Sequence, residues 1–158
     1  MLTTTDVGFI EMRIAQVVGF GPPLSEEEFQ CVVLDEVSGD RHLVIEIGQQ
    51  EAFYLAASLQ DIRFGRPMTY QLAAALVRGL GGRVRQVRID RLVAGAYAAT
   101  VEVEGPLGVQ LIDARSSDAL NLGAITAASI FVSPEVVDRK STRLNSSHSA
   151  KSRMPSSA

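Results

Sequence analysis

The 158-residue sequence contains no tryptophan, only three tyrosines and six phenylalanines, and a single cysteine, Cys31. So few aromatic side chains predict that the chain has no dense platform for stacking single-stranded nucleic acid. One cysteine excludes an intramolecular disulfide and a cysteine-rich zinc site, and we interpret Cys31 as a packing residue of an apolar strand. His42 is the only histidine before residue 139, which excludes a catalytic triad and a histidine-rich metal site. We interpret His42 as an ordinary strand residue.

Long hydrophobic runs are also missing. No stretch approaches the roughly 20 apolar residues that cross a bilayer, and the N-terminus lacks a basic flank followed by an apolar segment. Apolar residues nevertheless make up 46% of the chain and charged residues 21%, so a packed core can form. The length fits one domain. These observations predict a soluble, cytoplasmic, single-domain protein that does not contact a membrane.

Charge divides the chain into two parts. Residues 1–138 hold all 18 acidic residues against ten arginines and no lysine, a net charge of -8. Residues 139–158 carry five basic residues, no acid and many serines. This composition predicts a disordered basic tail, for which we favour a non-native origin over a nucleic-acid-binding arm. The predicted domain therefore covers residues 9–138, after a frayed N-terminus over residues 1–8.

The order of hydrophobic patterns indicates an α+β fold. Alternating apolar segments bounded by glycine-containing turns predict strands at 9–20, 29–35, 41–47, 83–92, 97–103, 109–113 and 130–132. Helical spacing predicts helices at 51–59, 70–80 and 118–127, with Thr69 and either Ser116 or Ser117 as N-caps, and one more helical turn from Pro134. Because hairpins outnumber β-α alternations, we expect one domain with a mostly antiparallel, mixed sheet and about three helices.

Two carboxylates bracket an arginine at the junction of a predicted strand and helix: Asp113, Arg115 and Asp118. Such carboxylates can hold a divalent cation, Mg²⁺ or Mn²⁺, while the arginine and the helix N–H groups meet a phosphate. Alternatively, Asp118 stabilises the helix N-terminus and Arg115 neutralises Asp113. The residues alone leave both interpretations open.

Other arginines offer further candidates. Arg66 precedes Pro67 at the entry to the second predicted helix, where it is either solvated or directed at an acid elsewhere. A cluster that includes Arg83 and Arg85 can contact phosphates, or simply supply the positive charge of a body that contains no lysine.

The segments together resemble the bifunctional nuclease domain family over residues 10–137. The resemblance rests on three motifs in order: IEIGQQEA at 45–52, RPMT at 66–69, and DARSSDA at 113–119 followed by IFVSPEV at 130–136. Each motif is weak alone, but their order and spacing are specific in combination. The family's pattern continues RPxT with His-Asp, where this chain has Tyr70 and Gln71, and has proline where this chain has Ser116. The Tyr70-Gln71 replacement removes the best general base that the pattern offers.

The resemblance implies an α+β fold, a homo-oligomer, and a nuclease that acts on the phosphodiesters of DNA and RNA. Carried onto this sequence, it gives Asp113, Arg115, Asp118 and Arg66 as catalytic residues. Asp113 and Asp118 would also hold the metal. We expect Arg83, Arg85 and Tyr70 to contact substrate. The alternative function is a non-catalytic, oligomeric binding or regulatory module, in which the same arginines and acids form ion pairs that join the helices.

Overall fold

The computed structural model describes residues 8–20, 29–140 and 142–143. This part of the chain holds seven strands longer than three residues and four helices. Their bounds are β1 Ile10–Phe20, β2 Phe29–Glu36, β3 Arg41–Ile47, α1 Gln49–Leu59, α2 Thr69–Gly79, β4 Arg83–Val93, β5 Ala96–Gly105, β6 Gly108–Arg115, α3 Ser116–Thr126, β7 Ser129–Val132, α4 Pro134–Lys140 and β8 Thr142–Arg143. The two-residue β8 is the last described segment of the chain.

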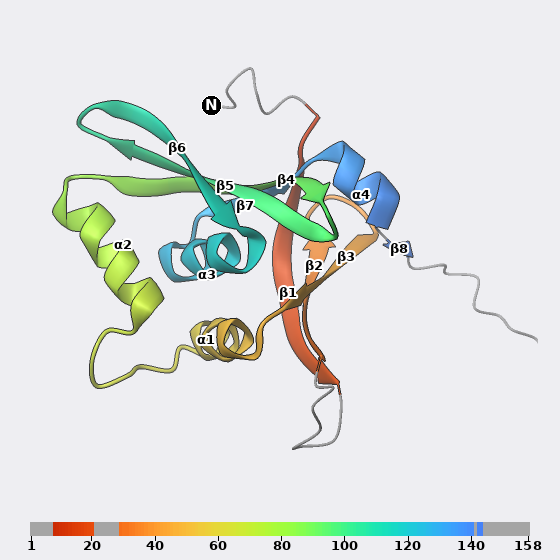
Figure 1. Ribbon diagram of the computed structural model, residues 1–158, viewed down its shortest axis with the longest axis horizontal. Helices are drawn as coiled ribbons and strands as arrows, with labels where there is room; N and C mark the ends of the chain where they lie inside the picture. The colour runs from red at the N-terminus through yellow and green to blue at the C-terminus, as the bar shows by residue number, and fades with distance from the viewer. Residues whose placement is uncertain (1–7, 21–28, 141, 144–158) are drawn as a thin grey trace, which may run out of the picture.

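The strands form one mixed sheet in the order β6-β5-β4-β7-β1-β2-β3-β8. Each neighbouring pair is antiparallel except β4 and β7, which are parallel. The parallel β7 therefore joins the β4-β5-β6 meander to the β1-β2-β3 meander, and the two run in different directions in Figure 1. This arrangement confirms the predicted α+β domain with a mostly antiparallel sheet.

The helices α1, α2 and α3 gather on one side of the sheet (Figure 1), where apolar residues of alternate strand positions are buried. Leu34, Leu43 and Ile45 have no exposed surface, as period-two burial in a sheet with one covered face requires. Helix α3 approaches β4 closely at Gly123, where an added Cβ would lie 3.2 Å from Val87 Cγ2. A side chain at position 123 would require Val87 or the helix to shift by a few tenths of an ångström.

Two predicted N-caps are wrong, because the helices begin earlier than their apolar periodicity indicates. Helix α2 begins at Thr69, so Met68 is the N-cap, and its backbone N–H donates to Gln71 Oε1 at 2.8 Å. Helix α3 begins at Ser116, and its N-cap is Arg115, without a side-chain cap hydrogen bond.

The end of the domain extends past the predicted boundary at residue 138. Helix α4 continues to Lys140, and β8 pairs with the start of β3. The remainder of the predicted tail (residue 141 and residues 144–158) and most of the predicted frayed N-terminus lie outside the described residues. No helix among the described residues is long and apolar enough to cross a membrane.

His42 lies on β3 as predicted, directly opposite Asp35 of β2. Its Nδ1 is 2.6 Å from Asp35 Oδ1, so this histidine has a cross-strand carboxylate partner.

Gln71→Ala and Thr69→Ala distinguish the observed cap from the predicted one. Gln71→Ala leaves the N–H of Met68 without its acceptor, and should lower the free energy of unfolding by about 0.5–1 kcal/mol. Thr69→Ala removes no cap contact, so the matched urea-unfolding curve should stay within about 0.5 kcal/mol of the parent. A larger loss in free energy of unfolding for Thr69→Ala than for Gln71→Ala would place the cap at Thr69.

Candidate functional site

The candidate site lies where β6 gives way to α3. The backbone of Arg115 is still extended (φ -70°, ψ 150°), and the helix starts at the next residue. Arg115 is therefore both the last residue of an edge strand and the N-cap of α3, a position that leaves its side chain largely exposed. The site is built around this guanidinium.

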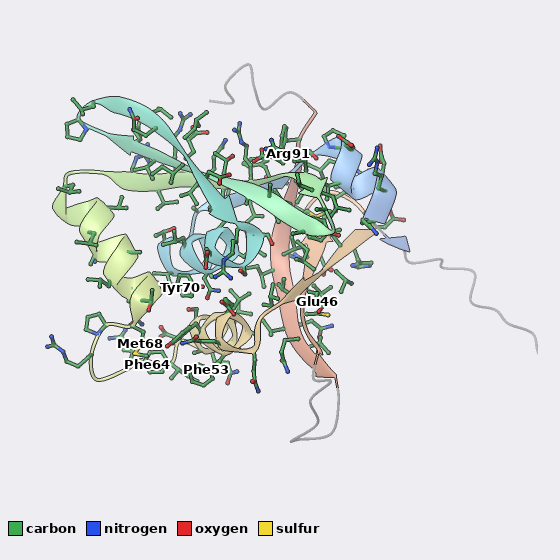
Figure 2. The ribbon with its side chains drawn as sticks, viewed as in Figure 1. Glu46, Phe53, Phe64, Met68, Tyr70 and Arg91 are labelled. Carbon is green, nitrogen blue, oxygen red and sulfur yellow. The ribbon has the colours of Figure 1, made fainter. Side chains whose placement is uncertain are left out.

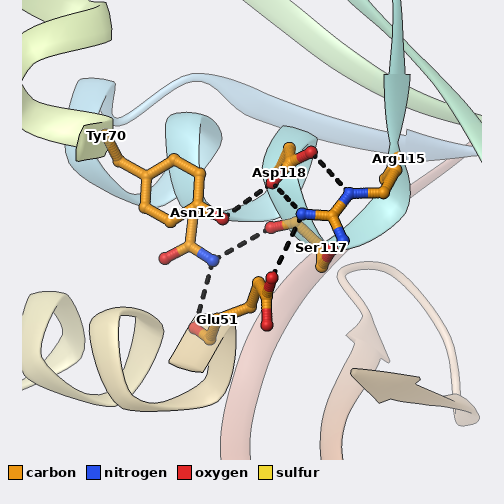
Figure 3. Close-up of polar contacts among 6 residues, drawn as sticks. All are labelled: Glu51, Tyr70, Arg115, Ser117, Asp118 and Asn121. Carbon is orange, nitrogen blue, oxygen red and sulfur yellow. Dashed lines mark hydrogen bonds and ion pairs between the residues drawn. The ribbon is translucent and has the colours of Figure 1, made fainter. Parts of the chain in front are cut away.

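Two carboxylates hold the Arg115 side chain (Figure 3). Its Nε donates to Asp118 Oδ2 and its Nη2 to Asp118 Oδ1, both at 2.9 Å, which is the paired geometry that fixes a guanidinium plane. The same Nη2 donates to Glu51 Oε1 of helix α1 at 3.1 Å. Nη1 has no partner among the described residues, so two N–H donors of a fixed cation remain available.

Tyr70 completes the cluster from helix α2. Its hydroxyl donates to Asp118 Oδ1 at 2.7 Å, and its ring packs edge-to-face on Tyr54 with centroids 5.8 Å apart. Helices α1, α2 and α3 thus each contribute one residue of their first turn to the same polar cluster. These residues are Glu51, Tyr70 and Asp118, respectively.

A fully buried amide ties two of these helices together. Asn121 Nδ2 donates to the backbone carbonyl of Glu51 at 3.1 Å and to that of Ser117 at 2.9 Å. Asn121 thereby connects the first turn of α1 to the first turn of α3 and fixes the distance across which Glu51 meets Arg115 (Figure 3).

Gly48 explains the spacing in the motif IEIGQQEA. The carboxylate of Glu51 lies back over Gly48, where an added Cβ would be 2.1 Å from Glu51 Oε2. Gly48 is the N-cap of α1 and has ordinary extended angles, so the glycine leaves space for the Glu51 carboxylate and does not serve an unusual backbone conformation. Ala52, the last residue of the motif, is buried against the core.

The hydrogen bonds of the cluster shift three pKa values. Burial raises the pKa of Asp118, but the hydrogen bonds from Arg115 and Tyr70 outweigh it and the net pKa lies below the ordinary aspartate value. Burial and the bond to Asp118 raise the pKa of Tyr70 far above its ordinary value. The hydrogen bonds to Asp118 and Glu51 raise the pKa of Arg115. At neutral pH Asp118 is therefore a poor general base, and Tyr70 is a neutral donor.

An open pocket of about 450 Å³ adjoins Arg115. It lies between the N-terminal ends of α1 and α3 and the turn that joins β4 to β5, and its lining includes Gly48, Tyr97, Arg115, Ser116 and Ser117. Neither helix has a side-chain cap hydrogen bond at this end. The carboxylate of Glu46 also lines the pocket. Two helix N-termini and one guanidinium at the same pocket oppose its charge and favour an anionic ligand such as a phosphate.

Of the residues predicted from sequence, the structure brings together Arg115, Asp118 and Tyr70. Asp113 is not among them: it pairs in register with Thr100 of β5, which pairs with Arg88 of β4. Because cross-strand partners share a face and the neighbouring Ala114 packs against the core, Asp113 points away from α3. Arg66 is exposed in the link between α1 and α2 and makes none of the contacts in Figure 3.

The predicted metal ligands are therefore separated, and both oxygens of Asp118 already accept hydrogen bonds. Among the described residues no group of three or more histidine, cysteine or acidic side chains is placed to hold a metal ion. A metal at Asp113 and Asp118 stays a prediction, and we assign no chemical step to it.

Arg83 and Arg85 lie on β4, and both are engaged with acids of β5. Arg83 Nε donates to Glu104 at 2.8 Å, and Arg85 Nη1 lies 3.0 Å from Glu102, a carboxylate that is almost fully buried. Their positive charge is thus partly neutralised within the sheet.

Sequence reasoning missed Glu51 and Asn121. Glu51 stands inside a motif that was noticed, but nothing local indicates that α1 faces the start of α3. Asn121 had a usable signal, because it is the one polar residue of the apolar run between Asp118 and Thr126.

Comparison with known proteins gives one family and two relatives. The family model described as "Bifunctional nuclease domain" matches residues 32–145. Two curated proteins of Mycobacterium tuberculosis, "Uncharacterized protein MT1877" (strain CDC 1551 / Oshkosh) and "Uncharacterized protein Rv1829" (strain ATCC 25618 / H37Rv), are each 33% identical over 106 residues. The match covers 67% of this chain and 63% of each relative, so the chain spans less than two thirds of their length.

Asp118→Asn should change how stability depends on pH. Because the pKa of Asp118 is lowered on folding, its carboxylate stabilises the protein above the ordinary aspartate pKa of about 4, and that stabilisation is lost as the pH falls through the lowered value. The difference in free energy of unfolding between parent and variant should be largest near pH 7 and shrink towards pH 2. A difference that does not vary with pH would show that the carboxylate charge contributes nothing.

Proposed function

Because the chain belongs to the bifunctional nuclease domain family, we propose that it hydrolyses phosphodiester bonds of DNA and RNA at the pocket beside Arg115. The observation that supports this most directly is the fixed guanidinium. Arg115 lines the pocket, and its guanidinium is held in place by hydrogen bonds from Nε to Asp118 and from Nη2 to Glu51. Its Nη1 donors and the first N–H groups of α3 can then bind the oxygens of a phosphate whose negative charge grows in the transition state.

The residues around Arg115 contribute by holding its side chain in place before a phosphate binds. An exposed arginine normally loses much rotamer freedom when it binds a phosphate, whereas Arg115 has already lost it to two carboxylates. Glu51 is the carboxylate best placed to take a proton from an attacking water, because only its Oε1 accepts a hydrogen bond from Arg115. Asp118 and Tyr70 act as positioning residues.

Nucleic-acid binding should be electrostatic. The first 138 residues carry a net charge of -8, so affinity has to come from local arginines and not from the overall field. We propose that Arg83 and Arg85 extend the contact to flanking phosphates, with an effect limited by Glu104 and Glu102. Affinity should therefore fall steeply as salt is added.

The alternative function is a non-catalytic, oligomeric binding or regulatory module. One observation favours it: the hydrogen bonds and ion pairs of Figure 3 join side chains of α1, α2 and α3 to one another, as a purely structural ion-pair network would. The two functions differ in what the loss of Arg115 does to catalysis.

Arg115→Ala should lower the rate of cleavage of single-stranded DNA and RNA by about 10²–10³-fold, the usual effect of removing a donor to a developing anion. Arg13→Ala is the matched control, because Arg13 is equally exposed (69% against 67% of the side chain) and pairs with an acid away from the pocket. The control should cleave like the parent. Full activity in Arg115→Ala together with lower thermal stability would instead establish the structural module.

The same cleavage assay tests whether activity requires the predicted divalent metal ion. Parent protein assayed with EDTA, and then with Mg²⁺ or Mn²⁺ restored, should lose and regain cleavage if the sequence-based prediction of a divalent ion is right. Cleavage that persists in EDTA would remove the metal from the proposal.

We further propose that the protein self-associates through β6. The apolar, uncharged stretch 94–101 is mostly paired inside the sheet, and Ala99 and Val101 are buried. Strand β6 carries exposed apolar residues, including Val109 and the 60%-exposed Leu111, and pairs only with β5 among the described strands. An apolar edge strand of this kind is a common site for pairing with a second copy.

Sedimentation velocity at tens of micromolar protein should give a species larger than the monomer, and Leu111→Lys should return it to the monomer. Val44→Lys, at an exposed apolar position of β3, is the control and should leave the parent's distribution unchanged. A monomeric parent, or equal effects of the two variants, would contradict association through β6.

A further inference from the structure

Four aromatic rings gather between α1 and the start of α2. Phe53 and Tyr54 meet edge to face with centroids 5.5 Å apart, Phe64 lies 6.1 Å from Phe53, and Tyr70 lies 5.8 Å from Tyr54. Figure 2 shows Phe53, Phe64, Met68 and Tyr70 in this region. The chain is poor in aromatic residues, yet almost half of them form this one cluster.

The aromatic cluster is continuous with the polar cluster around Arg115. The Tyr70 hydroxyl donates to Asp118, which pairs with Arg115, while the Tyr70 ring packs on Tyr54. Tyr70 therefore connects the two clusters: its hydroxyl contacts the partner of Arg115, and its ring contacts the aromatic cluster.

Core packing does not account for Phe53. Helix α1 buries Ala52, Leu55 and Ala57 against the rest of the domain, while Phe53 is 59% exposed. The hollow that Tyr54, Phe64 and Tyr70 help to line holds only about 10 Å³, so the inside of the cluster is already filled. A ligand must lie on the outer face of the rings, where Phe53 is presented.

The charges beside the rings fit a nucleic-acid strand. Arg63 and Arg66 flank Phe64 in the link between the helices, and both are exposed. Exposed aromatic rings and exposed arginines in one short stretch of chain match a nucleotide chain, in which bases alternate with phosphates.

We propose that Phe53, supported by Phe64, stacks an unpaired nucleobase of the strand whose phosphate lies at Arg115. The inference rests on the proposed function and specifies its substrate. A base in a duplex is already stacked and paired, so the platform favours single-stranded DNA and RNA. It is tolerant of sequence, because each base offers a planar face.

Phe53→Trp converts the proposed platform into its own reporter, because the chain has no tryptophan. A nucleobase that stacks on an indole quenches its fluorescence. The titration uses fluorescein-labelled 12-nucleotide single strands, one with bases and one with a central run of abasic sites, so that anisotropy reports binding independently. The strand with bases should quench F53W and the abasic strand should not. The control Leu80→Trp, at a 79%-exposed position at the end of α2, should respond to neither.

Phe53→Ala tests how much the proposed stacking contributes to the affinity for the strand. It should bind the strand with bases about tenfold more weakly than the parent, and the abasic strand equally well. Binding of the base-containing strand without quenching of F53W, or with undiminished affinity in Phe53→Ala, would overturn the stacking site and leave the proposed function intact.

Two further outcomes show whether the proposed function also fails and whether a second copy of the chain covers Phe53. If the parent binds neither strand at low salt, the proposed function and the stacking site fail together. If the emission of F53W shifts with protein concentration and not with added strand, a second copy of the chain covers Phe53, which also contradicts the stacking site.

Discussion

The paired hydrogen bonds between Arg115 and Asp118 are the interaction on which the rest of the site depends. Arg115 comes from the end of an edge strand and Asp118 from the first turn of the following helix, so the bond fixes the angle at which α3 leaves the sheet. Charged hydrogen bonds in this fork geometry are about twice as strong as neutral ones. Asp118 also lies in the first helical turn, where its charge interacts favourably with the helix dipole.

Everything else at the site is arranged around that pair. Glu51 accepts a hydrogen bond from Nη2 of the guanidinium, and Tyr70 donates to the Asp118 oxygen that also accepts from Nη2. Asn121 sets the separation of α1 and α3. The consequence is a cation that points towards a pocket at two helix N-termini. An acidic domain can bind an anion there, because local donors and dipoles act over a few ångströms whereas the net charge of the body is screened within about 10 Å at ordinary salt.

Sequence patterns predicted most of the fold, and the site only in part. Strand alternation placed β3 at Arg41–Ile47 correctly, because one covered face leaves a clear period of two. Arg115, Asp118 and Tyr70 were recognisable from motifs, but the sequence could not show that Asp113 points to the other face of the sheet, since that depends on where β6 ends. The N-caps failed because α2 and α3 begin before their apolar periodicity does, so that the predicted caps are themselves helical residues. The low aromatic content of the chain likewise did not predict the aromatic cluster. A total over the whole chain does not show that Phe53, Tyr54, Phe64 and Tyr70 lie close together.

The central claim is that Arg115 is held by carboxylates and presents its remaining donors to a phosphodiester. Nitrogen-15 NMR of arginine Nε–H groups tests it most directly, with the Arg115 signal assigned through its loss in Arg115→Lys. In the parent, this signal should be slow to exchange with water and should shift when a non-hydrolysable dinucleoside phosphorothioate is added in EDTA, while that of the control Arg13 stays in place. An Arg115 signal that exchanges like a solvated arginine and does not move with the ligand would contradict the account.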